Sequence, residues 1–161
     1  MKNNRASVRF TAIIFVLTAL MLLFCWVHSC FPASVSSQES NSFYRVFYWF
    51  FGLFGAGQIV TQHIVRKLAH FSEFAAVGGL LLSCAYCFDR LRPQRYAAPV
   101  LFAGLSAALI DETIQLFIEG RAGMIADVWI DFAGVVTGAL LLLAFYALWR
   151  RTKRFKRTQG K

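Results

Sequence analysis

Four long apolar windows dominate the sequence and restrict the folds open to it. They run over residues 10–28, 68–88, 96–117 and 125–149, and each is close to the roughly 20 residues that an α-helix needs to cross a lipid core. Only helices and closed barrels satisfy their backbone polar groups in lipid, and these windows lack the strict alternation of barrel strands. The sequence therefore predicts an all-α membrane protein, a four-helix transmembrane bundle in a single domain over residues 1–161.

The first window has a second interpretation, as a cleaved signal peptide. Its apolar stretch is longer than the about 7–15 residues of a typical signal sequence. No clean cleavage site follows it, although residues 31–34 (Phe-Pro-Ala-Ser) are a weak candidate. We therefore expect a retained helix.

The segment over residues 31–67, which joins the first two windows, begins with a serine-rich stretch and then turns aromatic over residues 43–54. This aromatic run is too short to cross a membrane. Tyr and Trp favour the headgroup region, so we expect an interfacial or re-entrant segment after the first helix. The alternative is a packed loop that covers the bundle.

The positive charges are distributed unevenly along the chain. The formal net charge of +9 is typical of a nucleic-acid-binding protein only if the basic residues share a soluble surface. Thirteen of the 17 Lys and Arg residues instead lie in the amino end, in residues 89–95 and in the basic tail over residues 150–161. Short cytoplasmic segments are enriched in Lys and Arg. We therefore expect a multi-pass protein with both termini in the cytoplasm, with membrane lipids and not nucleic acid as its partner.

The polar residues inside the windows are the exception to their apolar character. A charge at the centre of a bilayer costs about 2.5–3.5 kcal/mol and usually faces the interior of a bundle. Helical periodicity places the polar residues of each window on one face. They are Lys67, His70 and Glu73 at the start of the second window, Asp111, Glu112 and Gln115 near the end of the third, and Asp127 and Asp131 at the start of the fourth, with Arg121 in the loop between the last two.

These polar residues all fall toward one side of the membrane in the predicted topology. With a rise of 1.5 Å per residue, Glu73, Asp111 and Asp131 are each expected roughly 8–9 Å below the outer surface. The sequence therefore predicts one polar site that opens toward the outer face or the outer leaflet.

Several of these residues also have structural interpretations. Lys67 and Arg121 could extend to lipid headgroups, and His70 could be a structural histidine. Glu73 could pair with Lys67 or His70, and Asp127 could stabilise the start of its helix. Asp111, Gln115 and Asp131 lie deeper, so a structural interpretation fits them less well and they carry most of the functional prediction.

Two blocks of residues have a family-specific spacing. The first is Lys67-Leu-Ala-His70-Phe71-Ser-Glu73-Phe74, followed by Gly78; the second is Asp111-Glu112-x-x-Gln115-Leu-Phe117, Gly120-Arg121-x-Gly123, Asp127-Val128-x-x-Asp131, Gly134 and Gly138. Over residues 66–140 the chain resembles the VanZ-like family of bacterial membrane proteins. The resemblance implies a bacterial cytoplasmic membrane location, action on the cell envelope and lower susceptibility to teicoplanin-type lipoglycopeptides. It implies little about chemistry.

Three classes of function fit the polar site. An enzyme would use His70, Glu73, Asp111, Glu112, Gln115 and Asp131 as its candidate catalytic residues. Lys67, Arg121 and Asp127 would then bind the substrate, with the two cations at a lipid phosphate. A non-enzymatic protein would bind or shield a surface lipid, a lipid-linked precursor or the antibiotic. An ion-coupled transporter is the least favoured, because the acids stop in the outer half.

No cofactor can be identified from the sequence. Carboxylates and a histidine could hold a divalent cation, but Lys67 and Arg121 would compete for the acids. Cys84 and Cys87 lack a second pair and are expected to be packing residues. Cys25 and Cys30 face apart on a helix, so no disulfide is expected between them.

Glycines near the start of the fourth window predict a close helix contact. Gly134 and Gly138 have the G-x-x-x-G spacing that lets two helices approach. We expect packing within the bundle, with an oligomer contact as the alternative.

Overall fold

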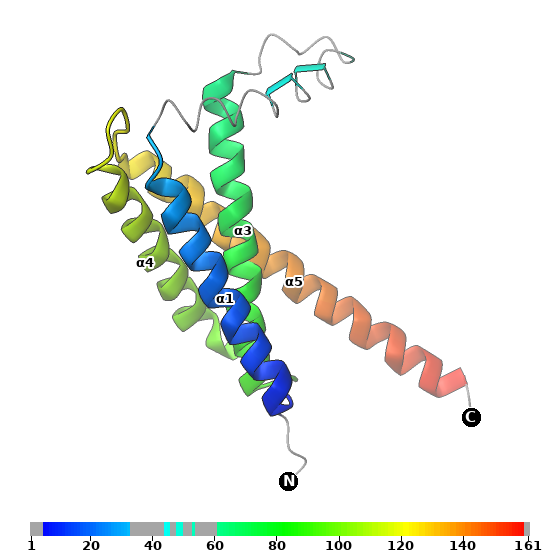
Figure 1. The fold of residues 1–161 in the computed structure, drawn as a ribbon. Helices are drawn as coiled ribbons and strands as arrows, with labels where there is room; N and C mark the ends of the chain where they lie inside the picture. Colours follow the sequence, from blue (N-terminus) through cyan, green and yellow to red (C-terminus); the bar gives the residue numbers. More distant parts are fainter. Residues whose placement is uncertain (1–4, 33–43, 46–47, 50–52, 54–60, 160–161) are drawn as a thin grey trace.

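Four long helices form the fold of this protein in a computed structural model that describes residues 5–32, 44–45, 48–49, 53 and 61–159. In chain order they are α1 (Val8–Ser29), α3 (Gln62–Phe88), α4 (Ala97–Gln115) and α5 (Ile125–Gln159), with the short 3-10 helix η2 (Pro93–Tyr96) before α4 (Figure 1). All four long helices are long and apolar enough to cross a membrane. The predicted all-helical class with four candidate spans is therefore confirmed, whereas most of the aromatic segment over residues 43–54 lies outside the described residues.

Side-chain caps define where two of the helices begin. The Ser7 hydroxyl accepts a hydrogen bond from the backbone N–H of Phe10 at 3.3 Å, one turn into α1. Thr61 does the same for Ile64 at 3.2 Å at the start of α3. Such caps satisfy N–H groups that have no partner inside the helix, so they fix the boundary.

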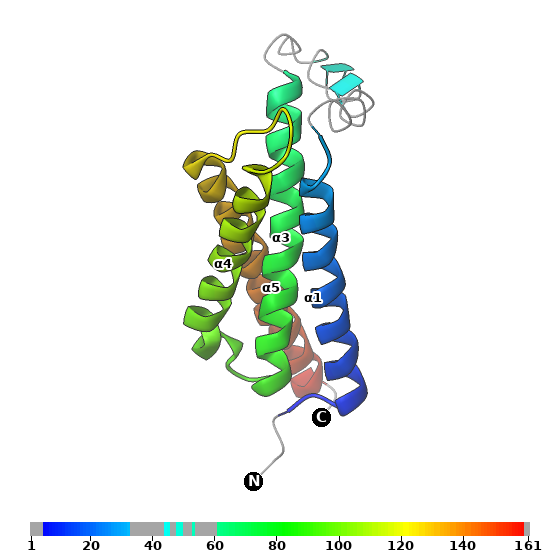
Figure 2. The same ribbon diagram turned by 60° about the vertical axis from the view of Figure 1, so that its left-hand side comes forward.

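The start of α3 differs from the prediction. The helix begins at Gln62, six residues before the predicted residue 68, because Thr61 caps a polar turn that the apolar pattern does not include. Its amino end extends beyond the ends of α1 and α4 (Figure 2). Glu73 therefore lies eleven residues after the start of its helix and not five after a start at residue 68, whereas its depth below the outer surface stays a prediction.

The other helix ends lie nearer to the prediction. Helix α1 runs over residues 8–29 where 10–28 was expected, and α4 ends two residues before the predicted residue 117. Helix α5 continues ten residues past residue 149 through the basic tail. Lys and Arg are good helix formers, which accounts for the continuation.

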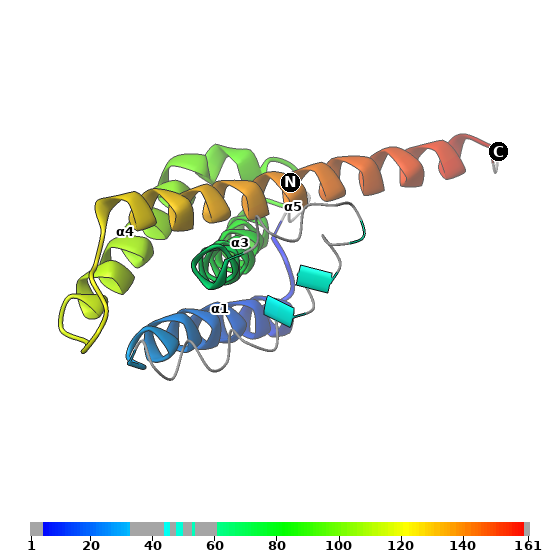
Figure 3. The ribbon, with the colours of Figure 1, turned by 90° about the horizontal axis from the view of Figure 1, so that it is seen from above.

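Helix α3 lies at the centre of the bundle. It contacts each of the other three long helices, α5 most extensively, and the view from above places it between α1 and α5 (Figure 3). Glycines allow this close approach, because a Cβ atom at Gly78 would collide with the backbone of Val135, and one at Gly138 with the backbone of Ala75. The face that holds Gly134 and Gly138 is thus covered by α3 within one chain, and an oligomer contact through it stays a prediction.

The interior and the outer surface of the bundle are both apolar. Phe74, Ala108 and Val135 are fully buried in the main core cluster. Large apolar side chains on α1, α4 and α5 point outward, among them Leu20, Phe102 and Leu141. Such a surface is a liability in water and is expected of helices that face lipid.

The four cysteines are all free. This agrees with the prediction that Cys25 and Cys30 form no disulfide.

Candidate functional site

The polar side chains of the two sequence blocks gather toward one end of the bundle. This end holds the carboxyl end of α1, the loop over residues 116–124 and the start of α5 (Figure 2). Four of the predicted site residues are buried there, namely Asp111, Glu112, Gln115 and Asp131. Buried charged and polar groups are costly in an apolar bundle, so this cluster is the strongest candidate for a functional site.

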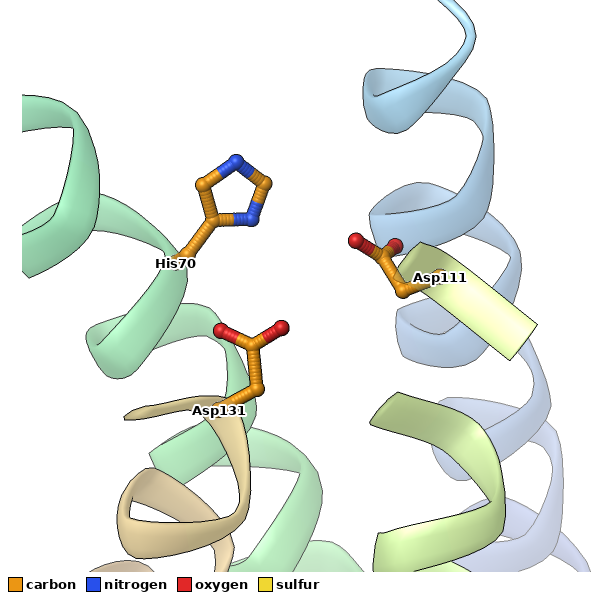
Figure 4. Close-up of side chains that lie close together, drawn as sticks. All are labelled: His70, Asp111 and Asp131. Atoms are coloured by element: carbon orange, nitrogen blue, oxygen red, sulfur yellow. The ribbon is translucent and has the colours of Figure 1, made fainter. Parts of the chain in front are cut away.

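Three of the predicted residues face one another at the centre of this cluster. His70 comes from α3, Asp111 from α4 and Asp131 from α5, and one nitrogen or oxygen atom of each lies within 4.8 Å of the others (Figure 4). Asp111 is 0% and Asp131 is 1% exposed. We call these residues the His–Asp–Asp triad. Among the described residues, none makes a hydrogen bond to His70 Nδ1, Asp111 Oδ1 or Asp131 Oδ2.

The carboxylate of Asp111 is held in place through its other oxygen. Ser29 Oγ, at the end of α1, donates a hydrogen bond to Asp111 Oδ2 at 2.7 Å. Gln115 Nε2, one turn further along α4, donates to the same oxygen at 2.9 Å. Both bonds are buried, so they fix the orientation of Asp111 and leave Oδ1 for the interior of the triad.

Glu112 has a different environment from Asp111. Its Oε2 accepts a hydrogen bond from the backbone N–H of Met124 at 2.9 Å, and its Oε1 lies 3.4 Å from Gln115 Nε2. The bond from Met124 connects α4 to the loop that leads into α5. The position therefore gives Glu112 a role in ordering the loop beside the site.

Glu73 pairs with a residue that was not predicted as part of the site. Its Oε1 lies 3.0 Å from His28 Nδ1 on α1, whereas its Oε2 lies 4.0 Å from His70 Nδ1. The rings of His28 and His70 stack with centroids 5.9 Å apart. Lys67 and His70 were the two partners predicted for Glu73. His70 lies near Glu73, whereas Lys67 pairs with Asp127.

His28 and Ser29 are the site residues that the sequence reasoning missed. His28 is the last residue of the first apolar window and Ser29 follows it; the window contains no Asp, Glu, Lys or Arg to suggest a polar face. The available signal was a histidine and a serine in adjacent positions at the same end of the bundle as the polar residues of the other three windows.

The cations of the site divide between two roles. Lys67 Nζ forms an ion pair with Asp127 Oδ1 at 2.6 Å, and Asp127 lies in the first turn of α5. Arg121 Nε donates to the backbone oxygen of Phe31 at 2.9 Å, which ties the loop to the end of α1. Within the described part of the chain, Arg121 Nη2 is buried and has no hydrogen-bond partner.

The surroundings of Arg121 disfavour the charged form of its guanidinium. Burial, and after it the positive charge of Arg66, lowers the pKa of Arg121 from its usual value. The usual pKa of arginine is so high that the group stays charged. A bound anion would relieve the repulsion between these two cations.

A cavity of about 200 Å³ connects the cations with two residues of the triad. Arg66, Lys67 and Arg121 line it together with His70 and Asp131. His63 and Arg66 were not predicted as site residues, because α3 was expected to begin after them. The cavity thus combines positive side chains suited to an anion with a carboxylate and an imidazole suited to proton transfer.

Comparison with known proteins identifies the family. No curated protein and no solved structure matches the chain. A family model described as VanZ/LLP1 matches residues 13–149, which include all four candidate spans in large part and the whole His–Asp–Asp triad. The match confirms the resemblance inferred from the two sequence blocks. The chain therefore belongs to the VanZ/LLP1 family.

Proposed function

We propose that this protein binds the phosphate-bearing headgroup of an envelope lipid, or of a lipid-linked precursor, at the outer side of the membrane and modifies it. The observation that carries the proposal is the single cavity shared by Arg66, Lys67, Arg121, His70 and Asp131. Arg and Lys are the side chains that bind phosphate best. An acid and an imidazole beside them are the groups that general acid–base catalysis uses.

The cationic part of the cavity supports an anionic ligand. Arg121 has an unpartnered Nη2 within the described residues, and Arg66 is close enough to lower its pKa. Lys67 shares its charge with Asp127. Arg121 is therefore the main phosphate-binding residue of this proposal, with Arg66 beside it and Lys67 as a secondary contact.

The proposed chemistry is a hydrolytic step at the bound headgroup. Asp131 and His70 both line the cavity, so one of them can accept a proton from a water molecule that attacks a phosphorus atom of the headgroup. The P–O bond to the leaving group then breaks, and the other residue, in its protonated form, donates a proton to the leaving oxygen. Glu73 Oε2 lies 4.0 Å from His70 Nδ1 and would stabilise a protonated imidazole. Asp111, which Ser29 and Gln115 hold in one orientation, would add a fixed carboxylate next to these two residues.

The charge distribution supports an outer location for the cavity. The cavity lies at the end of the bundle opposite the turn over residues 89–92, which carries basic residues that favour the cytoplasm. With both termini cytoplasmic, the cavity opens to the outer side. The effect implied by the resemblance, lower susceptibility to teicoplanin-type antibiotics, would then follow from an altered envelope lipid.

Mass spectrometry of envelope lipids and muropeptides tests the proposal. Cells would carry wild type, Asp131→Asn or no protein, with Asp89→Asn as the matched control at the opposite end of the bundle. We expect a mass change with wild type and Asp89→Asn that is lost with Asp131→Asn at equal membrane abundance. A mass change that survives in Asp131→Asn, or no mass change with wild type, would contradict a modifying activity.

Arg121 separates modification from binding alone. In a protein that only binds and shields the headgroup, Asp131→Asn would keep the change in antibiotic susceptibility and Arg121→Gln would lose it. For a modifying enzyme we expect both variants to lose it. Removing a charge-assisted hydrogen bond costs about 1.5–3 kcal/mol, so Arg121→Gln should weaken binding to phosphate-bearing lipid vesicles by roughly 10- to 100-fold. Arg95→Gln, at the other end of the bundle, is the control.

A further inference from the structure

We propose that the His–Asp–Asp triad binds one divalent transition-metal cation, Zn²⁺ or Mn²⁺, between α3, α4 and α5. The proposal goes beyond the lipid headgroup, because it stands on the geometry of His70, Asp111 and Asp131 and holds whether or not the cavity receives a phosphate. With the ion bound, His70 and Asp131 would be its ligands, and the ion would take over the activation of water that the metal-free site assigns to them. One imidazole nitrogen and two carboxylate oxygens form a donor set that both cations accept.

The spacing of the three donor atoms fits a single ion. They lie within 4.8 Å of one another, and Figure 4 shows a ring nitrogen of His70 and both carboxylates turned toward a common space. Ligands at about 2.0–2.2 Å from one ion lie at most about 4.4 Å apart. Small side-chain movements therefore bring all three atoms into the coordination sphere.

Three buried atoms of the triad have no hydrogen-bond partner among the described residues, which supports a bound cation. In the described part of the chain, Asp111 Oδ1 and Asp131 Oδ2 are buried and make no hydrogen bond, and the same is true of His70 Nδ1. Leaving a buried charged or polar group unsatisfied costs about 1–3 kcal/mol or more. Three such atoms that face one another are best satisfied together, by a cation in the space between them.

Neither of the two cations expected to compete for the acids forms an ion pair with the triad among the described residues. Lys67 pairs with Asp127 at 2.6 Å, and Arg121 donates a hydrogen bond through Nε to the backbone oxygen of Phe31. The competition expected from these two residues is thus reduced by the fold. Two nearly fully buried aspartates, Asp111 and Asp131, then share a site, and neither forms an ion pair among the described residues. A divalent cation would balance their negative charge.

The surroundings of Asp111 resemble the support that metal ligands need. Carboxylates that bind metals are usually held by hydrogen bonds from a second layer of residues, and here Ser29 and Gln115 hold the oxygen that faces away from the triad. His70 and Asp131 also line the cavity. Three protein ligands with access to a cavity is the arrangement of a catalytic zinc site, where the remaining position takes water or substrate.

Calorimetric titration of the full-length protein in detergent tests the proposal. After removal of bound metal with a chelator, Zn²⁺ and Mn²⁺ would be titrated separately. We expect one ion per chain for at least one of them, and an affinity at least tenfold lower in Asp131→Asn and in His70→Gln. Glu119→Gln, which removes an exposed acid at the same end, is the control and should bind as wild type does.

Ser29→Ala provides a test that keeps all three ligands. Outer-layer partners of metal ligands typically contribute about 10- to 100-fold in affinity, so this variant should bind the ion at least tenfold more weakly while its helices stay folded by circular dichroism. The absence of stoichiometric binding, or triad variants that bind as wild type does, would overturn the proposal. The titration contains no lipid phosphate, so failure of the proposed lipid activity would leave its result unchanged.

Discussion

At the scale of single residues, the cost of burying charge made much of the site predictable. Asp111 and Asp131 stand deep in apolar windows, and the structure brings both to the triad with His70. His28 and Ser29 were missed because their partners lie on other helices, and a serine in a helix carries no signal of its own. Contacts such as Ser29 with Asp111 depend on how α1 and α4 pack, which local sequence patterns do not encode.

Phe74 tests the packing immediately beside the triad. It is fully buried in the core cluster, so Phe74→Ala should leave a cavity and lower the free energy of unfolding by about 3–5 kcal/mol. Phe102 is 74% exposed on the lipid-facing surface. Phe102→Ala should cost much less, because lipid can fill the space. Thermal unfolding in detergent measures both, and equal destabilisation would contradict the described core.

At the scale of helices, length and hydropathy predicted which segments are helical better than where they end. Helix α3 was expected at residue 68 and begins at Gln62. Its first turns are polar, so the apolar pattern could not include them, and the Thr61 cap decides the boundary. Because the helix was expected to begin later, Arg66, which lines the cavity, was not predicted as a site residue.

Two adjacent glycines on α3 test its close packing against α5. A Cβ atom at Gly78 would collide with the backbone of Val135, whereas one at Gly79 would meet its nearest atom, Gly138 O, at 3.8 Å. Gly78→Ala should therefore destabilise the protein by about 1–3 kcal/mol through overpacking. Gly79→Ala should be neutral or stabilise it by up to about 1 kcal/mol, since alanine is the better helix former. Similar unfolding temperatures for the two variants would contradict this contact.

At the scale of the whole molecule, the net charge of +9 separates into two ends with different roles. The amino end, residues 89–95 and the tail hold most of the positive charge, which predicts their cytoplasmic location. Apart from Asp89, the acids of the described residues lie toward the opposite end, where the fold places the cavity and the triad. The number of spans and the polar end could be predicted from the sequence. The pairings inside the site could not, since they depend on how the helices cross.

The central claim is that the cavity opens to the outer side, and cysteine accessibility in cells with an intact cytoplasmic membrane tests it most directly. In a variant whose four native cysteines are replaced by alanine, single cysteines would be introduced as Glu119→Cys beside the cavity and Arg92→Cys at the opposite end, both at exposed positions. A membrane-impermeant maleimide should label Glu119→Cys in intact cells and Arg92→Cys only after permeabilisation. The reverse pattern would mean that the cavity opens to the cytoplasmic side of the membrane, which would contradict an action on the outer envelope.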